Sequence, residues 1–475
     1  MSDRFPPQIK YIIGNEAAER YSFYGMKAIL VLFMTQTLLF QDSDATALFH
    51  LFVFAAYFTP LLGGYLSDRF WGKYRTIMTL SIAYVAGHAV LALYESRTGL
   101  YVGLGLIALG AGGIKPCVSA HVGDQFTEST KHLIPKVFGV FYFSINFGSF
   151  FATYMTPLTR RWFGAQVAFG VPGVLMAIAV FIFWLGRHHY VSVPPTGKRS
   201  DTPFKVLWHW LSHDRAATIA RFGAAPVEAA LAVGRVAVVL IPVCGFWALY
   251  DQTGSSWVLQ ATRMELHGLE PDQLQAINPL MIMAIIPLFA IVVYPWFERR
   301  GMTPTPLRRM TVGMFLTAVA FAASATIELF SDTRTVSGVV VTHLRELAYA
   351  GAPVTELADR YAAFFAEPIE RISALWQIVP YLLLTAAEVL VSVTGLEFAY
   401  TQAPRAAKST VMSFWLMTIS FGNLLAAFVA SLNAFDGVAY FAFWTGLMAV
   451  VAVIFTALAS RYKVVEYMEP DEADY

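Results

Sequence analysis

Residues 11–40 read YIIGNEAAERYSFYGMKAILVLFMTQTLLF, an apolar stretch that contains four charged side chains. As a helix, this stretch is long enough to cross the hydrocarbon core of a bilayer, which is about 30 Å thick. Steps of three and four residues place its polar and aromatic side chains on one helical face. That face comprises Glu16, Glu19, Arg20, Phe23, Tyr24 and Lys27. Because a lipid-facing helix would not carry such a stripe, we expect it to line an internal polar cavity.

The composition of the whole chain agrees with a membrane protein. Of its 475 residues, 14% are charged and 57% are hydrophobic, whereas about 25% are charged in a typical soluble domain. The 33 basic and 32 acidic residues balance, which excludes a nucleic-acid-binding protein driven by bulk charge. The two cysteines, Cys117 and Cys244, exclude a disulfide framework, and we expect no metal site. The prediction is one all-α polytopic membrane protein that interacts with the lipid bilayer.

Further apolar stretches are long enough to cross a bilayer. They are residues 45–67, 76–93, 98–114, 137–159, 165–186, 273–297, 310–327, 409–435 and 437–460. Three more, at 11–40, 235–262 and 372–400, are interrupted by charge, so we predict twelve crossings. Lys and Arg are concentrated in the loops on the side of the two termini, which predicts that both termini are cytoplasmic. Arg160 and Arg161, on the opposite side, are local exceptions.

The spacing of the crossings predicts two bundles of six helices. The first covers residues 1–190, and the second covers 235–463 with a periplasmic excursion at 331–371. The basic segment 191–234 is expected to be a cytoplasmic linker, in which residues 204–222 form an amphipathic surface helix. Residues 464–475 are an acidic cytoplasmic tail.

Charges within the crossings recur at every third crossing. After the first come Lys115 in the fourth, Asp251 in the seventh and Glu388 in the tenth. This interval indicates nested three-helix repeats whose equivalent helices line one central cavity. The alternative is that these side chains sit near the ends of crossings and extend to water.

The signs of these charges differ between the two halves. The cations Arg20 and Lys115 belong to the first half, and the acids Asp251 and Glu388 belong to the second. A cavity with one positive and one negative wall suits a zwitterion. Two or three extended residues span about 7–10 Å, so a short peptide reaches both walls where a free amino acid does not.

Other polar groups are weaker candidates. Asn146 and Asn278 offer an amide to a peptide backbone, although hydrogen bonds between helices explain them as well. Tyr24, Tyr57 and Trp415 either line the cavity or pack in the core. His50 is a candidate proton site or a plain interfacial histidine.

Several motifs, in order, resemble those of the proton-dependent oligopeptide transporters, the POT/PTR family of the major facilitator superfamily. Residues 16–25, EAAERYSFYG, resemble the ExxER motif of the family. Residues 63–72, GGYLSDRFWG, and 138–149, FGVFYFSINFGS, resemble its two signatures. The segments GIKP at 113–116 and WALYDQ at 247–252 are also similar. The resemblance covers nearly the whole chain and implies a major facilitator fold.

The resemblance also implies roles for individual residues. Glu16, Glu19, Arg20 and Lys115 would couple proton movement to binding of the peptide carboxylate, and Glu388 would receive the amino terminus. Contacts to the peptide backbone would come from Tyr24, Tyr57, Asn146 and Asn278. Lys27 and Asp251 would form a periplasmic gate, and His50 stands where animal members carry a proton-linked histidine.

This sequence departs from the family pattern in places. Phe23 replaces a common tyrosine and Phe147 replaces a smaller residue. The linker is too short and too charged for the two extra helices of many bacterial members, so the prediction remains twelve crossings.

The resulting hypothesis is a proton-coupled symporter of di- and tripeptides that works by alternating access. It would act as a monomer in a bacterial inner membrane, with protons as the coupling ion and no other cofactor. A proton-driven drug antiporter on the same scaffold is the alternative, which explains the acids and aromatics but not Arg20 with Lys115. A nitrate carrier fits the intact ExxER motif less well. No set of catalytic residues points to an enzyme.

Overall fold

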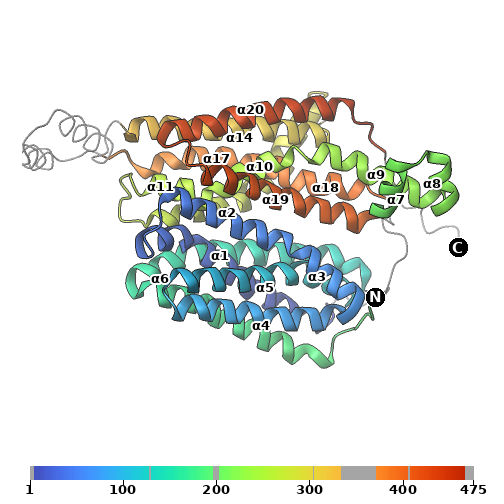
Figure 1. The fold of residues 1–475 in the computed structure, drawn as a ribbon, viewed down its shortest axis with the longest axis horizontal. Helices are drawn as coiled ribbons and strands as arrows, with labels where there is room; N and C mark the ends of the chain where they lie inside the picture. Colours follow the sequence, from blue (N-terminus) through green and yellow to red (C-terminus); the bar gives the residue numbers. More distant parts are fainter. Residues whose placement is uncertain are drawn as a thin grey trace, which may run out of the picture.

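The computed structural model describes residues 5–127, 130–195, 203–302, 304–332, 371–404 and 407–465. Two helical bundles lie side by side, with the first half of the chain in one and the second half in the other (Figure 1). This confirms the predicted all-α fold of two bundles. The end where α1 begins and α20 finishes is called the terminal end below, and the end where α14 finishes is called the distal end.

The N-terminal half contains six α-helices and two π-helical segments in its transmembrane part. They are α1 (Ile9–Leu32), η1 (Phe33–Thr37), α2 (Asp42–Phe58), α3 (Pro60–Leu66), η2 (Ser67–Trp71), α4 (Gly72–Leu93), α5 (Arg97–Gly123) and α6 (Ile134–Leu185). Helix α1 packs along α6, and α4 packs along α5.

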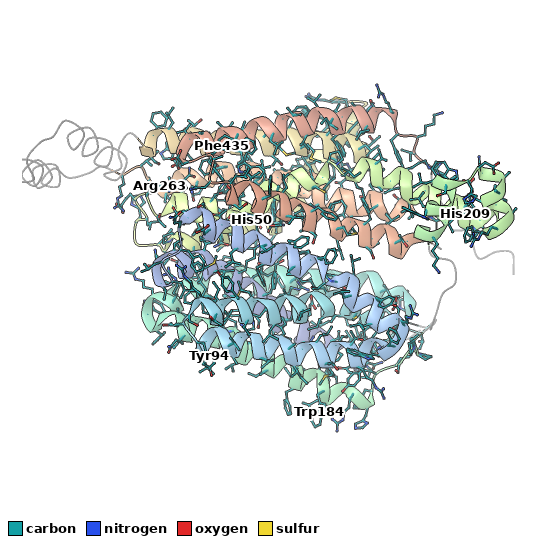
Figure 2. All side chains as sticks on the ribbon, in the orientation of Figure 1. His50, Tyr94, Trp184, His209, Arg263 and Phe435 are labelled. Carbon is teal, nitrogen blue, oxygen red and sulfur yellow. The ribbon has the colours of Figure 1, made fainter. Side chains whose placement is uncertain are left out.

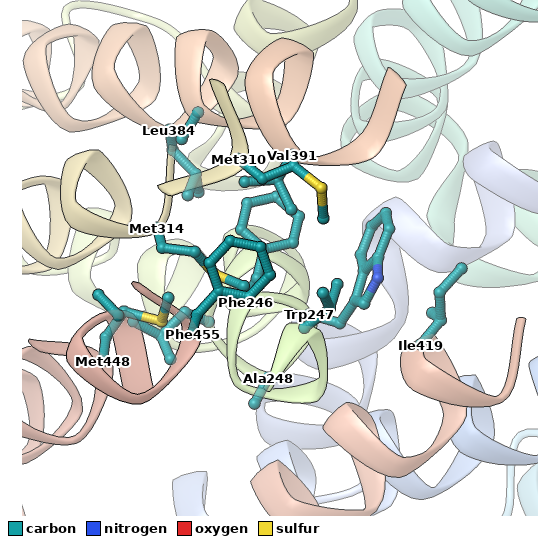
Figure 3. Packing of buried hydrophobic residues seen from close by; sticks show 14 of the residues in the cluster. Phe246, Trp247, Ala248, Met310, Met314, Leu384, Val391, Ile419, Met448 and Phe455 are labelled. Carbon is teal, nitrogen blue, oxygen red and sulfur yellow. The ribbon is translucent and has the colours of Figure 1, made fainter. Parts of the chain in front are cut away.

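The C-terminal half repeats this plan with more interrupted helices. They are α9 (Ala224–Leu240), α10 (Val243–Tyr250), η5 (Asp251–Gly254), α11 (Ser256–Ala261), η6 (Pro271–Ala276), α12 (Ile277–Leu288), η7 (Phe289–Val293), α13 (Tyr294–Arg299), α14 (Pro306–Asp332), η8 (Ala374–Gln377), α17 (Ile378–Glu388), η9 (Val389–Val393), α18 (Thr394–Thr401), α19 (Lys408–Ser431) and α20 (Gly437–Arg461). Aromatic residues of α10 meet methionines of α14 and α20 in the core of this half (Figure 3).

The helices of the described residues account for twelve crossings of the membrane. In the described part of the chain, eight helical segments are long and apolar enough to cross, and a pair bent by 48° at residues 224–261 makes nine. Two of the eight, Asp42–Leu93 and Phe143–His188, have 52 and 46 residues. Each turns back at a glycine of positive φ, Gly72 at 72° and Gly164 at 84°, and therefore crosses twice. These segments give eleven crossings. Helix α1, which has too many charges to be among the eight segments, is the twelfth.

The linker differs from the prediction in two respects. Residues 204–222 were expected to form one helix, but α7 (Pro203–Ser212) and α8 (Arg215–Phe222) are separate. The break arises because the side chain of Asp214 caps α8 by accepting a hydrogen bond from the backbone N–H of Ala217 at 2.7 Å. Helix α9 begins at Ala224 and not near residue 235, because Gly223, with a φ of 85°, turns the chain between α8 and α9. Most of the expected excursion at 331–371 and of the tail at 464–475 lies outside the described residues.

Glycines allow α3 and α5 to touch through their backbones. A Cβ atom built on Gly63 would lie 2.2 Å from the carbonyl oxygen of Gly113. At neighbouring Gly64 the same atom would meet nothing within 4 Å. Small residues therefore fix the contact between these two crossings.

We expect Gly63→Ala to destabilise the protein by about 1–3 kcal/mol, because the added methyl group forces the two helices apart. The matched control is Gly64→Ala, which is expected to leave stability unchanged or slightly higher. Thermal unfolding in detergent measures both. Equal melting temperatures for the two variants would contradict the assigned contact.

Candidate functional site

The charged face of α1 is buried and internally paired. Arg20 Nε lies 2.6 Å from Glu16 Oε1 and 3.0 Å from Glu19 Oε2. Glu16 and Arg20 thus pair at i,i+4 along the helix, and the guanidinium group of Arg20 also reaches Glu19. One cation thus balances two buried acids.

A second cation faces the same region from α5. Lys115 Nζ is buried and, among the described residues, has no hydrogen-bond partner. It lies 4.0 Å from the ring centroids of both Phe23 and Tyr57. Such cation–π contacts are worth about 2 kcal/mol each when desolvated, but they leave the three N–H donors of the ammonium group available. Lys115 is therefore suited to receive an anionic group.

An acid is held in the opposite half. Glu388 ends α17, and its Oε2 accepts a hydrogen bond of 2.8 Å from the side-chain amide of Asn278. The same amide donates to Thr385 at 3.1 Å, and its oxygen accepts a bond of 3.2 Å from the hydroxyl of Tyr250. These contacts fix the orientation of the carboxylate. Tyr250 was not identified from the sequence, since aromatic residues are frequent in apolar crossings.

Tyr57 lies between the two halves, beside Lys115. Its ring centroid lies 4.0 Å from Lys115 Nζ, and its side chain packs against the hydrophobic cores of both halves. Lys115 of the first half therefore lies where the two halves meet, and a single site that it shares with Glu388 stays a prediction.

A polar chain joins the halves on the distal side of this region. Lys27 Nζ lies 2.6 Å from Asp251 Oδ1, and the amide of Asn423 donates to Asp251 Oδ2 at 2.8 Å. His50 Nδ1 lies 2.8 Å from Asn423 Oδ1, and its Nε2 lies 3.0 Å from Ser255 Oγ. Since Asn423 gives its N–H to Asp251, its oxygen faces His50. Nδ1 therefore carries a proton, and Nε2 of a neutral ring accepts from the serine. Figure 2 shows His50 where the two bundles meet.

Asn423 and Ser255 were not identified from the sequence. An amide in the apolar stretch 409–435 was the available signal for Asn423. The sequence contains no signal for Ser255, because hydroxyl side chains commonly form hydrogen bonds within their own helix.

Ion pairs close the distal end further out. Arg160 of α6 lies 3.2 Å from Glu270 and 3.3 Å from Asp272, and Arg161 lies 3.2 Å from Glu270. The side-chain amide of Gln275 donates to the backbone oxygen of Ala28 at 3.0 Å. The two arginines that break the charge bias of the loops thus serve to join the halves.

Two candidates remain, Asn146 and Trp415. Asn146 is half-buried on α6. Trp415 is 3% exposed and packs edge-to-face on Trp247 at 6.4 Å between ring centroids, as part of the core of the C-terminal half.

Comparisons with known proteins identify the family of the chain. A family model described as the POT family matches residues 74–226 and 213–436. The chain is 30% identical to solute carrier family 15 member 2 of Danio rerio, covering 99% of this chain and 92% of that protein. It is 36% identical to peptide transporter 3 of Caenorhabditis elegans over 68% of this chain and 51% of that one.

Solved structures of POT family transporters are also similar to this chain. The crystal structure of an auto inhibited POT family peptide transporter matches with a TM-score of 0.84 and 37% identity, covering 98% of this chain and 99% of that chain. The in meso crystal structure of the POT family transporter PepTSo has a TM-score of 0.82 and 37% identity over 96% of this chain and 98% of that chain.

Proposed function

Because the chain belongs to the POT family, a family of membrane transporters and not of enzymes, we propose that it is a proton-coupled symporter of di- and tripeptides. The relatives named above are peptide transporters by name, which supports a peptide substrate. The chain is a multi-pass membrane protein. We place it as a monomer in a bacterial inner membrane with both termini in the cytoplasm, in line with the bias of basic residues toward the terminal end.

The observation that carries the proposal is the placement of the intramembrane charges, with the cations Arg20 and Lys115 in the first half and the acid Glu388 in the second. The carboxylate of a peptide would bind Lys115 and Arg20, and its ammonium group would bind Glu388. The length of an extended di- or tripeptide, about 7–10 Å, suits two facing half-bundles. Asn146, Asn278, Tyr24 and Tyr57 would contact the peptide backbone.

Arg20 provides the link to protons. It balances Glu16 and Glu19 at the same time. When Arg20 turns toward a peptide carboxylate, the two buried acids lose their shared cation, and burial then favours a protonated carboxyl group. Peptide binding and proton binding therefore assist each other.

Alternating access would use the contacts at the distal end as the gate. The structure is joined there through Lys27 and Asp251, through His50 and Asn423, and through Arg160. Opening this end to the periplasm requires these contacts to separate. Protons arriving at His50 or Asp251 would weaken the same contacts, which places both residues in the coupling path.

Uptake into liposomes tests the proposal. A membrane potential of 100 mV supplies about 2.3 kcal/mol per net charge, enough for roughly fiftyfold accumulation. Purified protein should accumulate a labelled dipeptide when the lumen is negative and the outside is acidic, and a protonophore should abolish this accumulation. Uptake that ignores the protonophore would rule out symport. Competition by a lipophilic cation but not by dipeptides would instead support a drug antiporter.

The gate predicts a charge dependence at one ion pair. Lys27→Ala and Asp251→Ala should each lower uptake at least tenfold, since a buried charge left unpaired costs about 3–5 kcal/mol. The exchange Lys27→Asp with Asp251→Lys should restore part of the uptake. As control, Lys73→Ala removes an ion pair with Asp124 that joins helices within one half. Wild-type uptake in both single variants would remove the assigned gate.

A further inference from the structure

A cavity of about 770 Å³ lies at the terminal end of the C-terminal half, away from the transport site. It is enclosed by the first turns of α14, the last turns of α18 and α20, and the chain that follows α20. Four threonines and a serine line it: Thr305, Thr311, Thr401, Thr456 and Ser460. Among the described residues that line it, Arg308 is the one charged side chain.

The wall beside α20 is held in place by Gln402, which is buried. Its side-chain oxygen accepts hydrogen bonds from the hydroxyl of Tyr462 at 3.2 Å and from the backbone N–H of Val465 at 3.0 Å. The N-terminal half uses the same device, where Gln125 accepts from the backbone N–H of Val191 at 2.9 Å. The chain leaving each half is thus fixed to a helix end, and the cavity has a rigid wall.

Arg308 stands at the head of an apolar strip. Steps of four, three and four residues along α14 lead from it to Val312, Phe315 and Val319, which lie on the same face. These three side chains are 57%, 40% and 52% exposed. Since α14 crosses the membrane, the strip contacts acyl chains. A lipid has its phosphate group at the membrane surface and its acyl chains below it, so Arg308 can contact the phosphate while the apolar strip contacts an acyl chain.

The surroundings of the cavity are basic. Arg299, Arg300 and Arg309 lie in or before the first turn of α14, and Arg461 and Lys463 lie around the end of α20. Glu298 and Glu397 are the described acids closest to the cavity in sequence. The charges of the described residues therefore favour an anionic ligand, although the chain beyond Val465 continues into the acidic tail.

We propose that this cavity binds an anionic phospholipid. Arg308 holds the headgroup phosphate, and an acyl chain follows Val312, Phe315 and Val319 along α14. The hydroxyls of Thr311, Thr401, Thr456 and Ser460 donate to their own helices, so their oxygens accept hydrogen bonds from headgroup hydroxyls. This site is independent of the proposed transport function and of the residues that serve it.

Lipid retention by the purified full-length protein tests the site. Native mass spectrometry would count bound phosphatidylglycerol and bound phosphatidylcholine at matched concentrations, and wild type should prefer phosphatidylglycerol. Arg308→Gln should weaken phosphatidylglycerol binding roughly fivefold, the effect expected of one basic residue at a membrane surface. Thr401→Trp, which fills the cavity without a change of charge, should weaken it to a similar extent.

The matched control is Arg300→Gln, since Arg300 lies at the same end over the ring of Trp296 and does not line the cavity. It should change retention by less than about twofold. Equal losses in Arg300→Gln and Arg308→Gln, or equal retention of both lipids by wild type, would overturn the site. Displacement of the lipid by equimolar glycerol 3-phosphate would show a site for soluble phosphates and also overturn the proposal. If Arg308→Gln does not fold, the result for Thr401→Trp decides.

Discussion

Glu388→Gln is expected to weaken dipeptide binding by at least about thirtyfold, because a buried charge pair with the peptide ammonium group contributes about 2 kcal/mol or more. Glutamine has nearly the same shape as glutamate, and its oxygen still accepts the hydrogen bond from Asn278 that glutamate accepts at 2.8 Å. The change therefore removes the charge and retains the local packing. Calorimetric titration with a dipeptide measures the effect.

An N-acetylated dipeptide separates this role from a general loss of binding. Acetylation removes the ammonium charge, so wild type should bind the acetylated peptide far more weakly than the free one. In Glu388→Gln the two peptides should bind almost equally. Glu397→Gln, an exposed acid on the following helix, is the control and should behave as wild type. A variant that keeps the full preference for the free peptide would show that the amino terminus binds elsewhere.

Local periodicity allowed the charged walls to be predicted. The recurrence of charge at every third crossing identified Lys115, Asp251 and Glu388, and steps of three and four residues identified the charged face of α1 that carries Glu16 and Arg20. These features follow from helix geometry and from the cost of charge in a membrane, both of which act within one helix. The pairing of Lys27 with Asp251 came from the family resemblance, because the distance between two helices is not encoded in either of them alone.

The contacts that the sequence left open are those between the halves and those set by side-chain rotation. Asn423 meets His50 only when α19 packs on α2. Arg20 reaches Glu19 as well as Glu16 because of its rotamer, which spacing does not determine. The break between α7 and α8 depends on one capping side chain in a segment whose apolar period suggested a single helix.

Glu19→Gln is expected to abolish proton-driven accumulation of peptide while peptide exchange across the membrane continues. Glu19 shares Arg20 with Glu16, so its replacement by a neutral residue of the same shape leaves the closer pair of 2.6 Å in place. The binding site for the peptide carboxylate is thereby kept, and one acid that takes up a proton is lost. Accumulation driven by a pH gradient should fall at least tenfold, because it requires that a proton is carried with each peptide. Counterflow of labelled against unlabelled dipeptide needs no net proton movement, so it should stay within about twofold of wild type.

The two assays together distinguish a loss of proton coupling from a loss of folding. A variant that is simply misfolded loses both activities, and Arg20→Gln should do so, because it leaves Glu16 and Glu19 buried without their cation at a cost of about 3–5 kcal/mol. Loss of counterflow in Glu19→Gln to the same degree as accumulation would mean that Glu19 serves peptide binding or folding and not proton coupling. If accumulation in Glu19→Gln is undiminished and a protonophore still abolishes it, the coupling proton binds another group. Glu16, which also pairs with Arg20, would then be the next residue to mutate.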